Sequence, residues 1–182
     1  MTVEAEAWVD DPFTDAILAG RGPLWLRRAD GGRIPLDVER WCAPAAGADH
    51  GLLLRCTRLS APVVDLGCGP GRLVAALLEL GVPALGVDIT RAAVARTRRL
   101  GGPALCRSVF DRLPAEGRWG GALLADGNLG IGGDPGSLLG RSAELLAPGG
   151  VLLVEVDPRE VDEQLTVRLE GPGRAAAWRP PR

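Results

Sequence analysis

An alternating run of glycines directly follows a short apolar segment of the chain. Pro62 introduces Val63 and Val64, and Asp65 stands at the end of the strand that these residues predict. Glycines then occupy every second position: Gly67, Gly69 and Gly71. Glycine reaches positive φ without strain and has no Cβ to keep a ligand away from the backbone. A strand, a glycine turn and a helix in this order predict a nucleotide site built from backbone N–H groups and a helix N-terminus.

The residue after the glycines narrows the class of nucleotide. A dinucleotide fingerprint reads G-x-G-x-x-G, and Arg72 stands where its third glycine would fall. A phosphate loop needs Lys followed by Ser or Thr, and the chain contains no Lys. Tyr is absent as well, so a Tyr–Lys proton-donor pair is missing. These departures disfavour an NAD(P)-dependent oxidoreductase, which stays an alternative.

Acidic residues also end the later predicted strands. Asp88 closes the strand 84–88, and Asp126 follows the strand 122–125. A carboxylate accepts two hydrogen bonds in a fork, which suits the vicinal hydroxyls of a ribose. The alternative for Asp88 is a helix cap beside Thr90.

The pattern Asp65-x-Gly67-x-Gly69-x-Gly71 resembles the first motif of class I S-adenosylmethionine-dependent methyltransferases. The later acids and the Pro-Gly-Gly turn at 148–150 follow in the order found in that family, over roughly residues 50–157. The resemblance implies S-adenosylmethionine as cofactor and S-adenosylhomocysteine as product. It also implies these cofactor-binding residues: Asp65, Gly67, Cys68, Gly69, Gly71, Asp88, Ile89, Phe110, Asp111 and Asp126.

Individual roles follow from the same resemblance. Asp88 corresponds to the acid that binds the ribose hydroxyls, and Asp111 lies where the family places an acid near the adenine amino group. Phe110 and Asp111 have a simpler alternative as a core residue and a turn residue. The glycine turn has the alternative of a purely structural connection.

The loop 126–134 lies at the carboxyl end of the fourth predicted strand, where parallel sheets form their ligand crevice. In the resembled family this loop faces the methyl group and the acceptor, so Asp126 and Asn128 are candidate substrate-binding residues. The loop lacks the Asn-Pro-Pro-aromatic sequence of enzymes that methylate amino groups of nucleic acids. Its alternative is a flexible linker.

No residue is assigned a catalytic role from the sequence. His50 is the only histidine, and it precedes the first core strand beside Asp49, a candidate helix cap. A structural role is therefore expected for His50. A catalytic thiol at Cys68 is not expected without a nearby histidine. Methyl transfer would depend on proximity and orientation of the two reactants.

Alternating strand and helix patterns predict a three-layer Rossmann-like α/β fold with a mostly parallel sheet. The predicted strands span 62–66, 84–88, 104–107, 122–125 and 151–156, and the predicted helices span 71–80, 90–100 and 136–146. Residues 49–182 are assigned to this S-adenosylmethionine-binding domain.

Residues 1–48 predict a separate N-terminal arm. A short helix begins at Asp11-Pro12 and ends at Gly20. Two short runs around an Asp-Gly turn at 29–32 predict a hairpin, with Pro35 on an edge strand. Most of the aromatic residues lie here, which favours a substrate lid over a satellite of the core: Trp8, Phe13, Trp25 and Trp41.

The C-terminal part is shorter than the seven-stranded sheet of the resembled family requires. One further strand is predicted at 165–169, and coil is predicted from 171 to 182. Part of the family's last strand pair is therefore expected to be absent, by truncation, as a degenerate copy, or because a partner completes the sheet. An uncovered edge beside the fifth strand invites a homodimer or a partner chain.

Composition limits the remaining function classes. The net charge is −2, which offers no basic field for nucleic acid. The four cysteines form no C-x-x-C pair, so zinc-ligand spacing is missing. The chain shows no signal peptide and no apolar run that could span a bilayer. We therefore expect a cytoplasmic protein with free thiols, no metal and no membrane partner.

Together these observations predict an S-adenosylmethionine-dependent methyltransferase that acts on a small-molecule acceptor. One alternative is a non-catalytic S-adenosylmethionine-binding module that needs a partner chain, for which the short C-terminal part is the evidence. The other alternative is the oxidoreductase.

Overall fold

A five-stranded parallel sheet forms the centre of the protein. The computed structural model describes residues 11–156, 167–172 and 174–177. The strands are β3 (Val63–Leu66), β4 (Ala84–Asp88), β5 (Ala104–Cys106), β6 (Trp119–Leu124) and β7 (Leu146–Val154). Their order in the sheet is β5-β4-β3-β6-β7, and every neighbouring pair is parallel. The glycine turn therefore leaves the middle strand.

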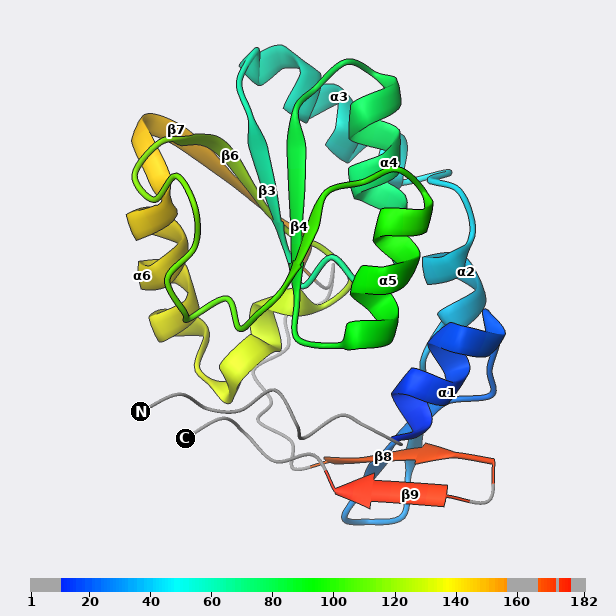
Figure 1. Ribbon diagram of the computed structural model, residues 1–182. Coiled ribbons are helices and arrows are strands. Elements are labelled where there is room, and N and C mark those ends of the chain that lie inside the picture. Colours follow the sequence, from blue (N-terminus) through cyan, green and yellow to red (C-terminus); the bar gives the residue numbers. More distant parts are fainter. Residues whose placement is uncertain (1–10, 157–166, 173, 178–182) are drawn as a thin grey trace.

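Both faces of this sheet are covered by helices (Figure 1). The helices are α3 (Asp49–Leu59), α4 (Arg72–Glu79), α5 (Arg91–Arg99) and α6 (Pro135–Leu145). Val63 and Val64 are fully buried in two different core clusters because successive side chains of a strand point to opposite faces. Val63 packs with residues of α3 and α4, whereas Val64 packs with residues of α6. The predicted three-layer Rossmann-like fold is confirmed.

A second, four-stranded antiparallel sheet combines both ends of the chain. Its order is β2-β1-β8-β9. The strands are β1 (Trp25–Arg28), β2 (Arg33–Pro35), β8 (Val167–Gly171) and β9 (Arg174–Ala177). The predicted hairpin is confirmed, with Pro35 on the edge strand β2. Figure 1 places this sheet beyond the carboxyl ends of β3 and β4, where the glycine turn lies.

The coil predicted from residue 171 onward is wrong for β9. Its sequence, Arg-Ala-Ala-Ala, has little intrinsic strand preference. The strand forms because its backbone pairs with β8, whose other edge is already paired with β1. Of the strand predicted at 165–169, residues 167–169 belong to β8, which continues to Gly171, and residues 165 and 166 fall outside the described part.

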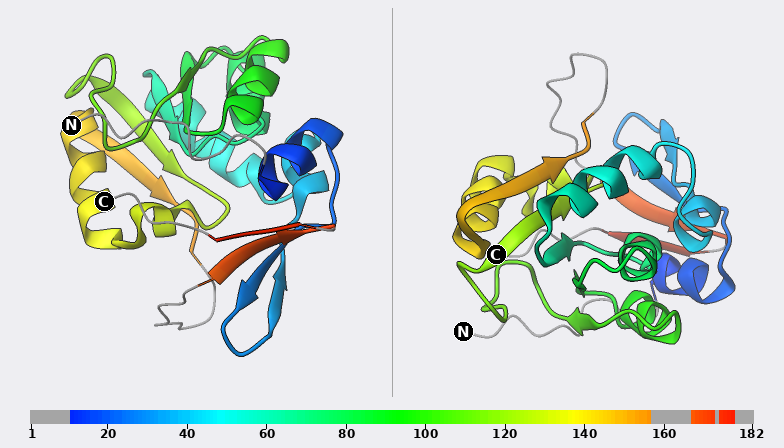
Figure 2. Two further views of the ribbon diagram at one scale, coloured as in Figure 1. Left: turned by 60° about the horizontal axis from the view of Figure 1, so that its bottom comes forward. Right: turned by 90° about the horizontal axis from the view of Figure 1, so that it is seen from above.

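The helix α1 (Pro12–Ala19) joins the second sheet to the rest of the fold (Figure 2). Asp11 caps it by accepting a hydrogen bond from the Thr14 N–H at 2.7 Å, and Gly20 ends it with φ 68°, as predicted. A third core cluster then unites α1 and β8 with α5 and the short helix α2 (Val38–Cys42). Residues 11–48 are thus packed against the parallel-sheet domain and the C-terminal strand β8.

The strand β7 is the free edge of the parallel sheet among the described residues. It pairs with β6 on one side only. Residues 157–166, which follow it, are outside the described part, so the predicted partner at this edge stays a prediction. No described helix is long and apolar enough to cross a membrane.

The third core cluster gives a test of how firmly β8 packs against the rest of the fold. Leu169 is 7% exposed and packs in this cluster, whereas Leu100 is 51% exposed. We expect Leu169→Ala to lower the free energy of unfolding by about 2–4 kcal/mol because it leaves a cavity. Leu100→Ala should change it by less than about 0.5 kcal/mol. Urea unfolding measures both, and equal effects would contradict the docking of β8.

Candidate active site

The glycine turn, residues 67–71, connects β3 to α4 at the carboxyl end of the sheet. Its three glycines all have positive φ: Gly67 at 78°, Gly69 at 52° and Gly71 at 88°. Residues with a Cβ are strained in this region. The alternating glycine spacing is therefore required by the backbone path.

The three glycines face different surroundings. A Cβ on Gly67 would lie 2.7 Å from Asn128 and Ile131, and a Cβ on Gly71 would lie 2.5 Å from Thr97. A Cβ on Gly69 would meet no described atom within 4 Å. Gly67 and Gly71 thus allow close packing of the protein on itself. Gly69 is the glycine that leaves room for a ligand.

The N–H groups of the turn are already bonded within the protein. Gly67 and Cys68 both donate to the carbonyl oxygen of Val87, and Gly71 donates to that of Cys68. Gly69 donates to Oδ2 of Asp88 at 2.9 Å. All four N–H groups are therefore engaged within the protein, and their contact with a ligand stays a prediction. A site of this kind offers no nest of turn N–H donors for a pyrophosphate.

Asp88 lies beside the open position at Gly69. Its Oδ1 accepts from the Thr90 N–H at 2.7 Å, so it also contributes to the start of α5. Burial raises the pKa of Asp88, and the two backbone hydrogen bonds oppose that rise. Each carboxylate oxygen has a further lone pair. The side chain can therefore hold the turn and still accept hydrogen bonds from two neighbouring hydroxyl groups.

Asp65 is a buried carboxyl group at the end of β3. It is 2% exposed, and no hydrogen bond to its side chain is found within the described residues. Burial raises its pKa to about 7, with Arg72 lowering it and Asp126 and Asp88 raising it. A buried acid without donors costs free energy when ionised. A cationic ligand at this end of the sheet would offset that cost.

Four charged side chains, Arg40, Asp49, Arg72 and Asp126, form an ion cluster between the turn and the loop after β6. Arg72, the first residue of α4, donates from Nε and Nη2 to Asp49 at 3.1 and 2.8 Å. Its Nη1 donates to Asp126. Arg40 of α2 donates to both acids as well. Two cations and two anions are thus matched at close range.

This cluster changes the interpretation of two residues, Asp49 and Arg72. Asp49 does not cap α3, because the cap position is Ala48 and the Asp49 carboxylate binds the two arginines. Burial alone raises the pKa of Asp49, but the hydrogen bonds from Arg72 and Ala46 outweigh it, so the pKa is lowered. Arg72, which appeared in the sequence only as a departure from the dinucleotide fingerprint, lies at the centre of the cluster.

The loop after β6 folds back onto the glycine turn. Asn128 donates from Nδ2 to the carbonyl oxygens of Leu66 and Gly67, at 3.0 and 2.8 Å. Asp126 has φ 53°, pairs with both arginines, and donates its own N–H to Oε2 of Glu155 at 2.7 Å. Both side chains are therefore engaged within the protein. Their roles in substrate binding stay predictions.

The remaining candidates lie around this centre. Phe110 is 37% exposed, and its ring lies 2.7 Å from the position that a Cβ on Gly132, in the loop after β6, would take. Asp111 accepts from the Ser108 N–H at 3.3 Å. Ile89 follows Asp88, and its carbonyl oxygen accepts from the thiol of Cys106. Burial raises the pKa of the Cys68 thiol well above its ordinary value, which keeps it protonated and unreactive. Contacts of these residues with a cofactor stay predictions.

The aromatic residues of the arm divide between two environments. Phe13 and Trp41 have ring centroids 6.1 Å apart and pack against the third core cluster. Trp25 lies under the guanidinium of Arg33 at 5.3 Å, and Trp8 lies outside the described residues. Phe13 and Trp41 thus pack on the third core cluster, and the substrate lid stays a prediction. His50 is exposed on α3.

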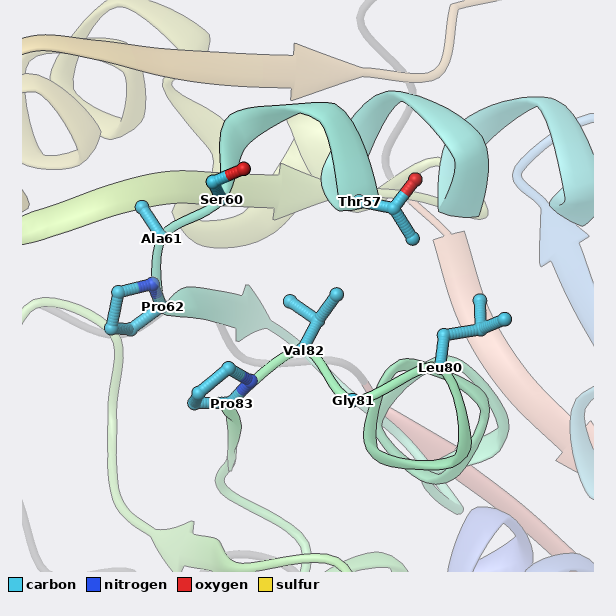
Figure 3. A pocket seen from close by; sticks show the side chains of 8 residues that line it. All are labelled: Thr57, Ser60, Ala61, Pro62, Leu80, Gly81, Val82 and Pro83. Carbon is cyan, nitrogen blue, oxygen red and sulfur yellow. The ribbon is translucent and has the colours of Figure 1, made fainter.

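Two depressions open on the described surface. One, seen in Figure 3, lies between Thr57, Ser60, Leu80 and Pro83 at the amino ends of β3 and β4, away from the turn. The other lies beside the ion cluster and shares Arg40 and Asp49 with it. No group of three or more metal-binding side chains is found among the described residues.

Residues 64–154, half of the chain, match the methyltransferase domain family. This chain belongs to that family. The resemblance to class I S-adenosylmethionine-dependent methyltransferases is thereby confirmed.

Solved structures of methyltransferases share the fold. The chain resembles an S-adenosylmethionine-dependent methyltransferase of Bacteroides fragilis, crystallised with S-adenosyl-L-homocysteine, with TM-score 0.73 and 20% identity over 98% of this chain and 82% of that one. The glycopeptide N-methyltransferase MtfA, also complexed with S-adenosylhomocysteine, gives TM-score 0.51 and 23% identity over 62% of this chain and 52% of that one. No curated protein matches the sequence.

Asp65 gives this methyltransferase-family chain a pH-dependent stability. An acid whose pKa is higher in the folded state than in the unfolded state stabilises the fold fully when the pH is below the unfolded-state pKa. This stabilisation is lost as the pH rises to the folded-state pKa, which for Asp65 means between about pH 4 and about pH 7. Asp65→Asn mimics the protonated acid. We expect the variant to gain stability over the wild type between pH 5 and pH 8, at about 1.4 kcal/mol per unit of pKa shift. Urea unfolding at both pH values measures this, and a pH-independent difference would contradict it.

The crowding at Gly71 gives a second test. Gly71→Ala and Gly81→Ala both place a Cβ at positive φ, but only the first meets Thr97, because nothing described lies within 4 Å at Gly81. The strained backbone should cost about 1–2 kcal/mol in each variant. Overpacking should cost Gly71→Ala about 1–3 kcal/mol more. Thermal unfolding compares the two, and an equal loss would show that Thr97 moves aside freely.

Proposed function

We propose that this chain binds S-adenosylmethionine at the glycine turn and transfers its methyl group to a small-molecule acceptor. The observation that carries the proposal is the open position at Gly69 directly beside the Asp88 carboxylate. Family membership supports the same activity, and the S-adenosylhomocysteine bound to two structural relatives supports the same cofactor.

The residues of the site fit this cofactor better than a dinucleotide. S-adenosylmethionine has no phosphate, and its sulfonium and ammonium groups are positive. The turn N–H groups are bonded within the protein, and two acids, Asp65 and Asp88, stand at adjacent strand ends. Asp88 would hold the ribose hydroxyls, and Asp65 would face the positive part of the ligand. Neither the oxidoreductase nor the non-catalytic module gains support from the comparisons.

When bound, the cofactor supplies an electrophilic methyl group on a sulfonium. The chain's part is to bind, orient and exclude water. The ion cluster fixes the first turn of α4 to the arm and to the loop after β6, which holds the turn in one place. Orientation of this kind can supply a large share of a rate enhancement without acid–base groups.

The described part of the N-terminal arm, residues 11–48, and the second sheet lie next to this end of the parallel sheet (Figure 1). The arm is proposed to select the acceptor. We also propose a cytoplasmic location, because the four cysteines are free thiols. A homodimer or a partner chain at the free edge of β7 remains our proposal for the assembly.

The ribose assignment predicts the effect of changing Asp88. Asp88→Asn keeps an acceptor for one backbone N–H but loses the forked carboxylate, so affinity for S-adenosylhomocysteine should fall about tenfold or more. Asp88→Ala should lose at least as much. Isothermal calorimetry measures both, with circular dichroism to check the fold. Asp30→Asn, at an exposed acid 64% accessible in the hairpin turn, is the control and should bind like the wild type. Unchanged affinity in Asp88→Asn would refute the assignment.

A further inference from the structure

The N-terminal arm reaches the ion cluster through Arg40, which lies in α2. Its Nη1 donates to Oδ1 of Asp126, and its Nη2 donates to Oδ1 of Asp49 at 3.1 Å. The same two oxygens also accept from Nη2 of Arg72, at 3.1 Å in Asp126 and 2.8 Å in Asp49. The two guanidinium groups therefore share one pair of carboxylate oxygens.

The two arginines differ in burial and in the number of their contacts. The side chain of Arg72 is 6% exposed and contacts both oxygens of both acids, whereas that of Arg40 is 37% exposed. Within the cluster, one cation between two carboxylates leaves one negative charge in excess, and Arg40 neutralises it. The cation that completes the charge balance beside the glycine turn thus comes from the arm.

The arm also has an apolar attachment that does not involve the cluster. Val38 is fully buried, and Trp41 and Cys42 pack against the third core cluster. Arg96 of α5 donates from Nη2 to the carbonyl oxygen of Cys42 at 2.9 Å. A helix of five residues, such as α2, depends on tertiary contacts of this kind. Because this packing already attaches α2 to the fold, the contacts of Arg40 serve mainly to fix α2 against the site.

The path from Arg40 to the glycine turn runs through Asp126. This residue begins the loop after β6 with φ 53°, and Arg40 is one of the groups that hold it there. Two residues further on, Asn128 donates to the carbonyl oxygens of Leu66 and Gly67. A displacement of Asp126 would change how Asn128 meets the turn. The position of α2 and the shape of the turn are therefore connected by a short chain of direct contacts.

We propose that Arg40 is a positioning residue: by binding Asp126, it couples the docking of the arm to the binding of the cofactor at the glycine turn. The inference rests on the proposed function. Coupling between two equilibria is reciprocal. If docking of α2 raises the affinity for the cofactor, the bound cofactor favours docked α2 by the same factor. The arm, which is proposed to select the acceptor, is then set for the acceptor in the cofactor-loaded chain.

Calorimetry with S-adenosylhomocysteine tests the first half of this coupling. Arg40→Met removes the charge but keeps good helix propensity, and we expect affinity to fall about fivefold or more. Arg40→Lys keeps a charge without the planar fork, so it should recover part of the loss. Arg21→Met removes an exposed positive charge of the same arm and should bind like the wild type. Wild-type affinity in Arg40→Met, with its fold verified by circular dichroism, would overturn the proposal.

A double-mutant cycle tests the route through Asp126. Asp126→Asn should weaken binding of S-adenosylhomocysteine by itself. With Asp126→Asn in place, Arg40→Met should cost little more, because the contact that transmits its effect is already weakened. Losses that simply add would contradict the route, since Arg40 would then act independently of Asp126.

Hydrogen exchange at α2 tests the reciprocal half. We expect S-adenosylhomocysteine to slow backbone exchange at residues 38–42 of the full wild-type chain, by about the factor that Arg40→Met loses in affinity. In Arg40→Met the nucleotide should leave this exchange unchanged. An arginine that only stabilises the fold would change exchange equally with and without the nucleotide, and that result would refute the coupling.

The same titrations separate the two levels of inference. If the wild type binds S-adenosylhomocysteine and Arg40→Met binds it equally well, only the positioning role fails. If the wild type does not bind the nucleotide, the proposed function fails, and the positioning role fails with it. Weaker binding in Arg40→Met, together with nucleotide-dependent protection of α2 in the wild type alone, supports both.

Discussion

The arrangement of the site depends on the contacts of one buried guanidinium, that of Arg72. A buried cation is stable only when matched acids surround it, and Asp49 and Asp126 supply them from α3 and from the end of β6. The planar fork of Arg suits two carboxylates at once. Ion pairs thereby connect the first turn of α4 to α3 and to the loop after β6. Arg40 extends the tie to the N-terminal arm.

This constraint explains the unusual backbone around it. Asp126 adopts positive φ, which is costly for a residue with a Cβ, and it is held there by both arginines and by Glu155. The loop that follows can then place Asn128 on the turn carbonyls. The turn needs glycines at 67 and 71 because side chains from this loop and from α5 fill the space that a Cβ would take. Charge pairing and glycine spacing are therefore parts of the same packing solution.

Local sequence signals were sufficient for the parallel sheet and for the position of the turn. Continuous apolar runs such as Val63-Val64, and the glycines after them, can be recognised from a few consecutive residues. The ion cluster could not be read in this way, because Asp49, Arg72 and Asp126 are brought together only by the chain's long-range path. The strand β9 was missed for the same reason, since Arg-Ala-Ala-Ala forms a strand only beside β8. The sequence did show an arginine, Arg72, directly after the glycine turn, but not that it is buried there and needs distant acids.

The two acids of the site, Asp65 and Asp88, indicate that its ligand carries a positive charge. Asp65 lies buried without a donor, at a cost to the folded state that a Leu or Val at the same position of β3 would avoid. Asp88 accepts hydrogen bonds from the N–H of Gly69 in the turn and from the N–H of Thr90 at the start of α5, which are donors that an anionic ligand would need. Both features disfavour a phosphate and favour a cation. A protein that keeps an ionisable group in such a place gives up stability for binding, as is common at functional sites.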